Sequence, residues 1–96
     1  MSQKKAHASA YRAITTINAP LSTHIDANIL VDCLLLQNRD PKWRPHIKSF
    51  FLDVNLDIIM DMVVEGSVSF NNLLECLNFW QLEESDNARW IREMAS

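Results

Sequence analysis

Apolar residues recur every three to four positions along most of the chain, which is the spacing of one face of an α-helix. No segment alternates apolar and polar residues for long enough to predict a β-strand. The pattern predicts five helices, at residues 3–17, 22–38, 45–65, 70–82 and from 85 to near the C-terminus. We therefore expect an all-α, compact bundle of about five helices in a single domain spanning residues 1–96. The long helix 45–65 is expected at its centre, packed against helix 22–38, with the first few residues and the last two frayed.

Prolines indicate where the helices begin and end. Pro20 closes the first helix, because proline disfavours the helical conformation of the residue before it. Pro41 and Pro45 lie four residues apart, and one helix does not easily hold both, because the Pro45 ring would clash with the carbonyl of Pro41. We therefore expect a loop or short turn at 38–44, with Pro45 at the first position of the long helix.

The only glycine, Gly66, follows the long helix, where a C-terminal cap needs a positive φ. If Gly66 took the sixth position of an EF-hand calcium loop, Val63 would take the third and Asn72 the twelfth. Valine has no side-chain oxygen, and asparagine cannot supply the bidentate carboxylate that the last position needs. We therefore interpret this segment as a helix end, a glycine cap and a new helix capped by Ser69.

Other motifs of catalysis or cofactor binding are missing from the sequence. His7, His24 and His46 are too scattered for zinc-ligand spacing, and one glycine cannot form a phosphate-binding loop. Cys33 and Cys76 sit inside apolar runs and are expected to be buried thiols rather than a disulfide. We expect no enzyme activity, no cofactor and no metal. No apolar run approaches the ~20 residues of a membrane helix, and no signal peptide is visible, so a cytoplasmic location is expected.

The charges are sorted between the two halves of the chain. Residues 1–48 hold seven Lys or Arg and three acids, whereas residues 49–96 hold two Arg and nine acids. Such sorting has two interpretations: the halves attract each other, within one molecule or between copies, or the charges are placed by accident on solvated faces.

Four acids, Asp53, Asp57, Asp61 and Glu65, recur at every fourth position of the predicted helix 45–65. On a helix they would form one narrow polar stripe, with almost every other position apolar. A helix with so narrow a polar face predicts burial on two sides. We expect one of those sides to be a subunit interface, which makes the protein a homodimer.

A basic cluster surrounds Trp43 in residues 39–48. It has three interpretations: a solvated connector with Trp43 folded onto the core, a protein-docking loop, or a nucleic-acid contact in which cations bind phosphates and the ring stacks on a base. The chain as a whole is acidic, with a pI near 5.5, which is unusual for a nucleic-acid-binding domain.

Our hypothesis from the sequence is a non-enzymatic protein-protein interaction module, acting as an adaptor, chaperone or inhibitor of a larger cytosolic protein. Trp and Arg anchor interfaces more often than chance, so Trp43 and Trp90, which follows Arg89, are the main contact candidates, whereas Trp80 is assigned to the core. The alternative is a small nucleic-acid-binding or transcription-associated regulator that uses the 39–48 loop together with Lys4 and Lys5. In a dimer, the loop is expected to approach the acids of helix 45–65 or of residues 83–86 in the neighbouring subunit. The candidate partner-binding residues are Arg39, Lys42, Trp43, Arg44, Lys48, Asp57, Asp61, Arg89 and Trp90.

Overall fold

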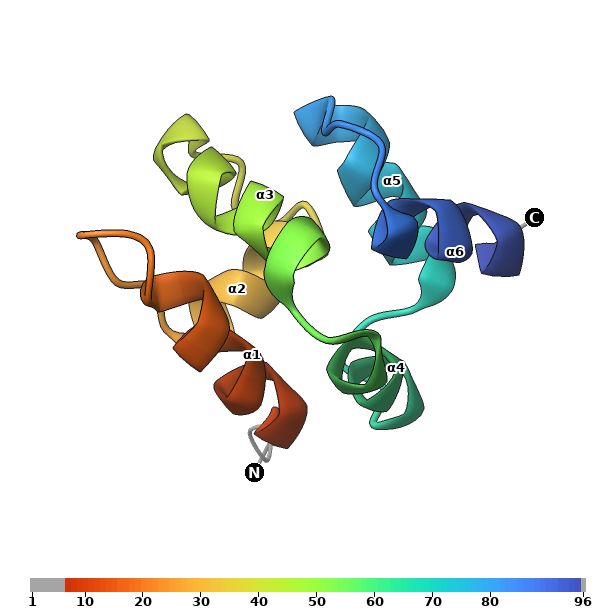
Figure 1. The fold of residues 1–96 in the computed structure, drawn as a ribbon, viewed down its shortest axis with the longest axis horizontal. Coiled ribbons are helices and arrows are strands. Elements are labelled where there is room, and N and C mark those ends of the chain that lie inside the picture. The colour runs from red at the N-terminus through yellow and green to blue at the C-terminus, as the bar shows by residue number, and fades with distance from the viewer. Residues whose placement is uncertain (1–6, 96) are drawn as a thin grey trace.

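The computed structural model describes residues 7–95, which form six α-helices and one short 3-10 helix, with no strand in that range (Figure 1). The predicted all-α class is confirmed, whereas the predicted fraying of residues near the N-terminus lies outside the described range. The radius of gyration is 12.3 Å, close to the ~12.5 Å expected of a compact chain of this length. The elements are α1 (Ala8–Asn18), α2 (Ala27–Leu34), η1 (Pro41–Trp43), α3 (Arg44–Asp53), α4 (Leu56–Val64), α5 (Phe70–Trp80) and α6 (Asp86–Ala95).

The long helix predicted at 45–65 is wrong, because the chain breaks between α3 and α4. Val54 and Asn55 both have extended backbone conformations, with ψ of 135° and 136°. The Asn55 side chain accepts a hydrogen bond from the amide of Asp57 at 2.8 Å, which makes it the N-cap of α4. Asn87 of α6 donates to the Val54 carbonyl at 2.8 Å, so the break is also fixed from outside. The single central helix therefore becomes two shorter helices.

The bounds predicted for helix 22–38 are also wrong, since α2 is shorter at both ends. Its N-cap is Asp26, whose carboxylate accepts from a backbone amide three residues later at 2.8 Å. Before it, Asn18 fixes the loop through two hydrogen bonds to the backbone of Ile25, at 3.0 and 3.1 Å. After it, Leu36 takes a positive φ of 61°, which no helix can continue through.

The predicted connection around Gly66 is confirmed. Gly66 has a φ of 82°, the left-handed conformation that glycine adopts at least cost. Ser69 caps α5 through a capping box: its hydroxyl accepts from the Asn72 amide at 3.0 Å, and the Asn72 side chain accepts from the Ser69 amide at 2.9 Å. The short turn expected before Pro45 is present as η1.

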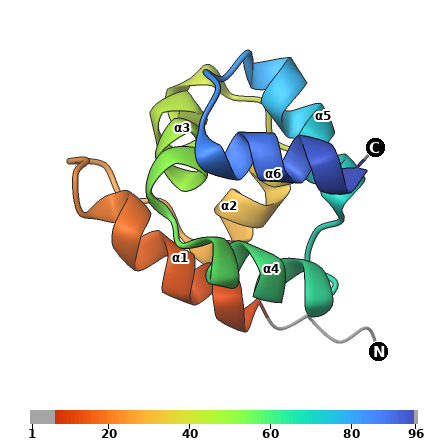
Figure 2. The ribbon, with the colours of Figure 1, turned by 45° about the vertical axis from the view of Figure 1, so that its right-hand side comes forward.

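The core lies where α1, α2, α3 and α5 meet, with α6 closing one side (Figures 1 and 2). Phe50 and Phe51 of α3 are fully enclosed and pack edge to face with ring centroids 5.0 Å apart. Trp80 is buried, as the sequence predicted. α4 packs mainly against α1, so the second half of the expected central helix lies at one side of the molecule.

Candidate functional site

The acidic stripe expected on one helix does not exist as a single face, because the break after α3 separates its first member from Asp57 and Asp61 on α4. Two of the acids bind α1 instead. Arg12 lies 3.0 Å from the Asp61 carboxylate, and both the amide and the hydroxyl of Ser9 donate to the carboxylate of Glu65. These acids therefore fasten α1 to α4 within one chain, while Asp57 remains exposed.

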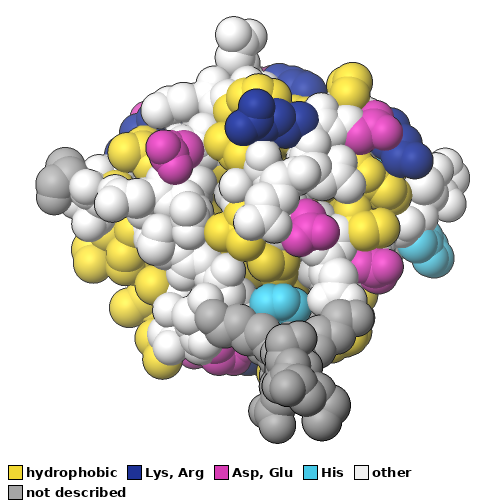
Figure 3. Space-filling model, turned by 180° about the vertical axis from the view of Figure 1, so that it is seen from behind, with side chains coloured by type: hydrophobic (Ala, Val, Ile, Leu, Met, Phe, Trp, Pro, Cys, Tyr) yellow, Lys and Arg dark blue, Asp and Glu magenta, His cyan; other side chains and the backbone are white. Residues whose placement is uncertain are grey.

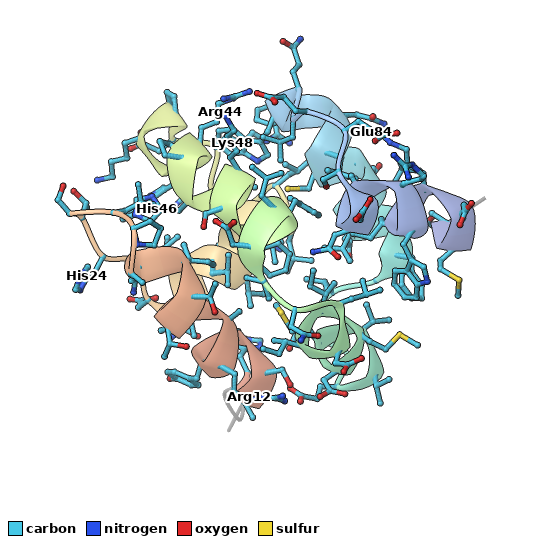
Figure 4. The ribbon with its side chains drawn as sticks, in the orientation of Figure 1. Arg12, His24, Arg44, His46, Lys48 and Glu84 are labelled. Carbon is cyan, nitrogen blue, oxygen red and sulfur yellow. The ribbon has the colours of Figure 1, made fainter. Side chains whose placement is uncertain are left out.

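The basic corner is the cluster around η1 and the start of α3. The Arg44 guanidinium donates to the carbonyls of Trp80 and Gln81 at 3.0 and 3.1 Å, where α5 ends. Lys48 forms an ion pair with Glu83 at 3.3 Å. Figure 4 shows Arg44 and Lys48 between the start of α3 and the end of α5. Most of the charge of the corner is thus used inside the chain. The members of the basic corner are Arg39, Lys42, Trp43, Arg44 and Lys48.

The rest of the basic corner makes ring contacts. Trp43 is only 7% exposed and packs edge to face with His46, at 5.1 Å between ring centroids. Lys42 lies 5.0 Å from the Trp43 ring, and Arg39 lies 5.4 Å from the ring of Phe79, which is itself exposed. Trp43 therefore folds back onto the core, and little of its surface remains for a partner.

A second surface, which we call the apolar strip, lies on α4 and α6. Both helices lie on the right-hand side of the molecule in Figure 1, connected through α5. Val64 is 76% exposed, Met94 47% and Met60 37%. Figure 3, from behind, shows hydrophobic side chains gathered along the left edge, on the side where α4 and α6 lie. The strip consists of Met60 and Val64 of α4, Phe70 at the start of α5, and Trp90 and Met94 of α6.

The strip follows from how each helix is covered by its neighbours. On α4, Ile59 and Met62 point into the core, so Met60 and Val64 lie on the opposite side at helical spacing. On α6, Trp90 is half-buried and packs edge to face with Phe70, at 5.4 Å between centroids. No neighbouring helix covers this face within residues 7–95.

Two of the predicted site residues flank the strip. Asp57 lies on the exposed side of α4, and Arg89 precedes Trp90 on α6, where it pairs with Asp86 at 3.7 Å. The sequence missed Met60, Val64, Phe70 and Met94. The available signal was the apolar excess of residues 56–64, which is larger than one neighbouring helix can cover.

Metal ligands and nucleophilic thiols are the remaining candidates for chemistry among the described residues. No group of three or more His, Cys, Asp or Glu side chains among residues 7–95 is arranged to hold a metal ion. Both cysteines are free and buried, as expected. Burial, aided by the charges of Asp32 and Asp40, raises the pKa of the Cys33 thiol to about 11, and burial also raises the pKa of Cys76. Neither thiol is therefore ionised at neutral pH, and an ionised thiolate is the nucleophilic form.

No helix in the described part of the chain is long and apolar enough to cross a membrane. No protein-family model matches this chain, and no curated protein or solved structure is significantly similar to it. Two surfaces therefore remain as candidates for function: the basic corner, whose charges are largely used within the chain, and the apolar strip.

Proposed function

We propose that this protein is a non-enzymatic protein-protein interaction module that docks its partner on the apolar strip of α4 and α6. It acts as a cytoplasmic adaptor, chaperone or inhibitor of a larger protein. The observation that carries the proposal is the exposure of Met60, Val64 and Met94 beside the half-buried Trp90.

The energetics of the strip support docking. Apolar surface removed from water contributes roughly 25 cal/mol per Å², and contiguous exposed apolar patches on small proteins commonly mark interaction sites. Trp and Met are enriched at interface cores, and the flexible Met60 and Met94 side chains adapt to the shape of a partner. Trp90 supplies the large aromatic anchor that most interfaces contain. The strip therefore combines the rigid aromatic ring of Trp90 with the flexible side chains of Met60 and Met94.

The shape of the strip favours a helical partner. Exposed apolar side chains of α4 and α6 lie on the same side of the molecule, and an apolar surface formed by two helices can receive the apolar face of an amphipathic helix. Exposed pairs of acids and arginines, such as Asp86 and Arg89, lie at its edge. A rim of this kind sets the orientation of a partner, while the apolar residues supply the affinity.

Site-specific photo-crosslinking tests the proposal. A photoreactive phenylalanine is placed at Val64 in the full-length chain, and in a matched control at Glu75, which is exposed on α5 away from the strip. We expect a covalent partner from extracts of the native host at position 64 and none at 75. Competition with unlabelled protein should remove the crosslink, whereas competition with the Val64→Glu variant should not. Equal crosslinking at both positions would show that the strip is not the docking surface.

The homodimer expected from the sequence remains a prediction, and the crosslinking experiment addresses it directly. If a second copy occupies the strip, the species captured at position 64 is the chain itself. Sedimentation velocity should then show a dimer that the Val64→Glu substitution converts to a monomer. The predicted contact through Lys48 needs revision, because Lys48 is paired with Glu83 of its own chain.

One observation supports the alternative function of nucleic-acid binding. Arg39 and Lys42 form ring contacts rather than ion pairs, and the exposed Phe79 next to Arg39 offers a ring on which a base could stack. Lys4 and Lys5, the other cations of this hypothesis, lie outside the described residues. Fluorescence anisotropy with single-stranded DNA at low salt tests it: binding should weaken steeply with added salt and be lost in Arg39→Ala with Phe79→Ala.

A further inference from the structure

A cleft of about 680 Å³ opens between α2, the end of α4 and the connection to α5. Its volume lies in the range of ligand-binding pockets. Phe70 and Val63 line the cleft, and Phe70 also contacts Trp90 of the apolar strip. The cleft and the strip are therefore continuous. The apolar residues that line the cleft are Val31, Leu35, Val63, Val68 and Phe70.

One carboxylate in the lining, that of Asp32, has no partner among residues 7–95. His7 and Ser67 are joined at 2.9 Å between the imidazole Nδ1 and the hydroxyl, and the side chains of Ser69 and Asn72 are used in the capping box of α5. The half-buried carboxylate of Asp32 forms no hydrogen bond or ion pair with any residue of 7–95. A cation bound at Asp32 would form a charge-assisted hydrogen bond, which is stronger than a neutral one.

The charges around the cleft select the sign of the ligand. Among residues 7–95 no Lys or Arg lines the cleft, and Asp32 is the one acid in its lining. The apolar walls fit a hydrocarbon stem, and Asp32 fits the cation at its end. A lysine side chain has this composition, with a flexible four-carbon stem and a compact ammonium group.

We propose that the cleft is an anchor pocket for a lysine of the partner, with the stem against Val31, Leu35 and Val68 and the ammonium group on Asp32. The partner is then an amphipathic segment whose apolar face lies on the strip and whose lysine enters the cleft. This assignment of the partner rests on the proposed docking function, whereas the preference of the cleft for an alkylammonium group can be measured independently.

Three small probes of matched length test the pocket: n-pentylammonium, n-pentanol and pentanoate, each titrated into the full-length protein and followed by amide chemical shifts. We expect pentylammonium to shift the amides of Leu35 and Val68 and to bind at least fivefold more tightly than pentanol. Pentanoate should bind more weakly than pentanol, because it faces Asp32 with like charge. Equal affinities for the three probes, or shifts confined to other regions, would overturn the proposal.

Two further measurements test whether the negative charge of Asp32 is what favours pentylammonium. Asp32→Asn should lower the affinity for pentylammonium to that for pentanol, whereas the control Glu75→Gln, on the exposed side of α5 and outside the cleft lining, should leave it unchanged. In the wild-type protein, added salt should weaken pentylammonium binding and leave pentanol binding unchanged. An unchanged affinity in Asp32→Asn, or no effect of salt on pentylammonium binding, would contradict the role of Asp32.

The lysine-pocket proposal and the docking proposal can fail independently, and the experiments distinguish the two cases. A crosslink at Val64 without any preference for pentylammonium would retain the strip and reject the lysine pocket. A preference for pentylammonium that Asp32→Asn abolishes, without a crosslink at Val64, would retain the pocket and reject the strip as the docking surface.

Discussion

The basic corner and the apolar strip both carry residue types that anchor interfaces, yet the fold treats them in opposite ways. In the corner, Arg44 binds the carbonyls at the end of α5, Lys48 pairs with Glu83, and Trp43 is buried. In the strip, Val64 and Met94 remain largely exposed. Arginine and tryptophan near a domain surface can therefore stabilise the fold rather than bind a partner. A docking surface differs from a stabilising contact because its side chains are exposed and have no partner within the chain.

The largest expected effect compares two positions of α4. Ile59→Ala should lower the free energy of unfolding by ~2–5 kcal/mol, because Ile59 is fully buried and its loss leaves a cavity. Val64→Ala should change it by less than ~0.5 kcal/mol, because the side chain is mostly in water and alanine favours the helix. Urea unfolding followed by circular dichroism measures both. A loss at Val64 as large as that at Ile59 would mean that the fold itself covers the strip.

An intermediate effect is expected in the basic corner. Arg44→Ala should cost ~1–3 kcal/mol, because it removes two charge-assisted hydrogen bonds and leaves carbonyls at the end of α5 without a donor. Lys42→Ala, which removes an exposed cation over the Trp43 ring, should cost less than ~1 kcal/mol. Thermal unfolding of both variants makes the comparison. A neutral Arg44→Ala would show that Arg44 is free to serve a partner.

The smallest effect is expected at the ion pair of Lys48 with Glu83. Both side chains are well exposed, so solvent screens the pair and the coupling should be at most ~1 kcal/mol. A double-mutant cycle with Lys48→Ala and Glu83→Ala isolates it, and the coupling should disappear at high salt. A larger coupling that resists salt would indicate a firmly desolvated pair, and the corner would then be more rigid than its exposure implies.

The parts of the fold that the sequence predicted correctly have local causes. The caps at Gly66 and Ser69 depend on φ preferences and on side chains that bond their own backbone within a few residues. The break at Val54 and Asn55 was missed because the apolar pattern continues across it. The hydrogen bond from Asn87 that fixes the break joins residues far apart in the chain, which periodicity does not reveal.

The candidate site was predicted only in part, for a related reason. Trp90 and Asp57 were named as partner-binding residues, which remains a prediction; the structure places Asp57 exposed on α4 and Trp90 half-buried on α6. Val64 and Met60 were placed on a helix expected to be buried on two sides, one of them a subunit interface, and were not named as site residues. Their exposure depends on which neighbours cover α4, and the pattern of α4 alone does not identify those neighbours. Whether this face binds a partner is what the crosslinking experiment decides.

The fastening of α1 to α4 has a consequence for the order of folding. Ser9 bonds Glu65, and Arg12 bonds Asp61, across 56 and 49 residues of sequence. During synthesis α1 can pair early with α2, but the face that carries Ser9 and Arg12 must wait until α4 has left the ribosome. Closing so long a loop costs entropy before any contact offsets it, and such distant contacts slow folding. α1 is therefore synthesised early but completes its packing against α4 late in folding.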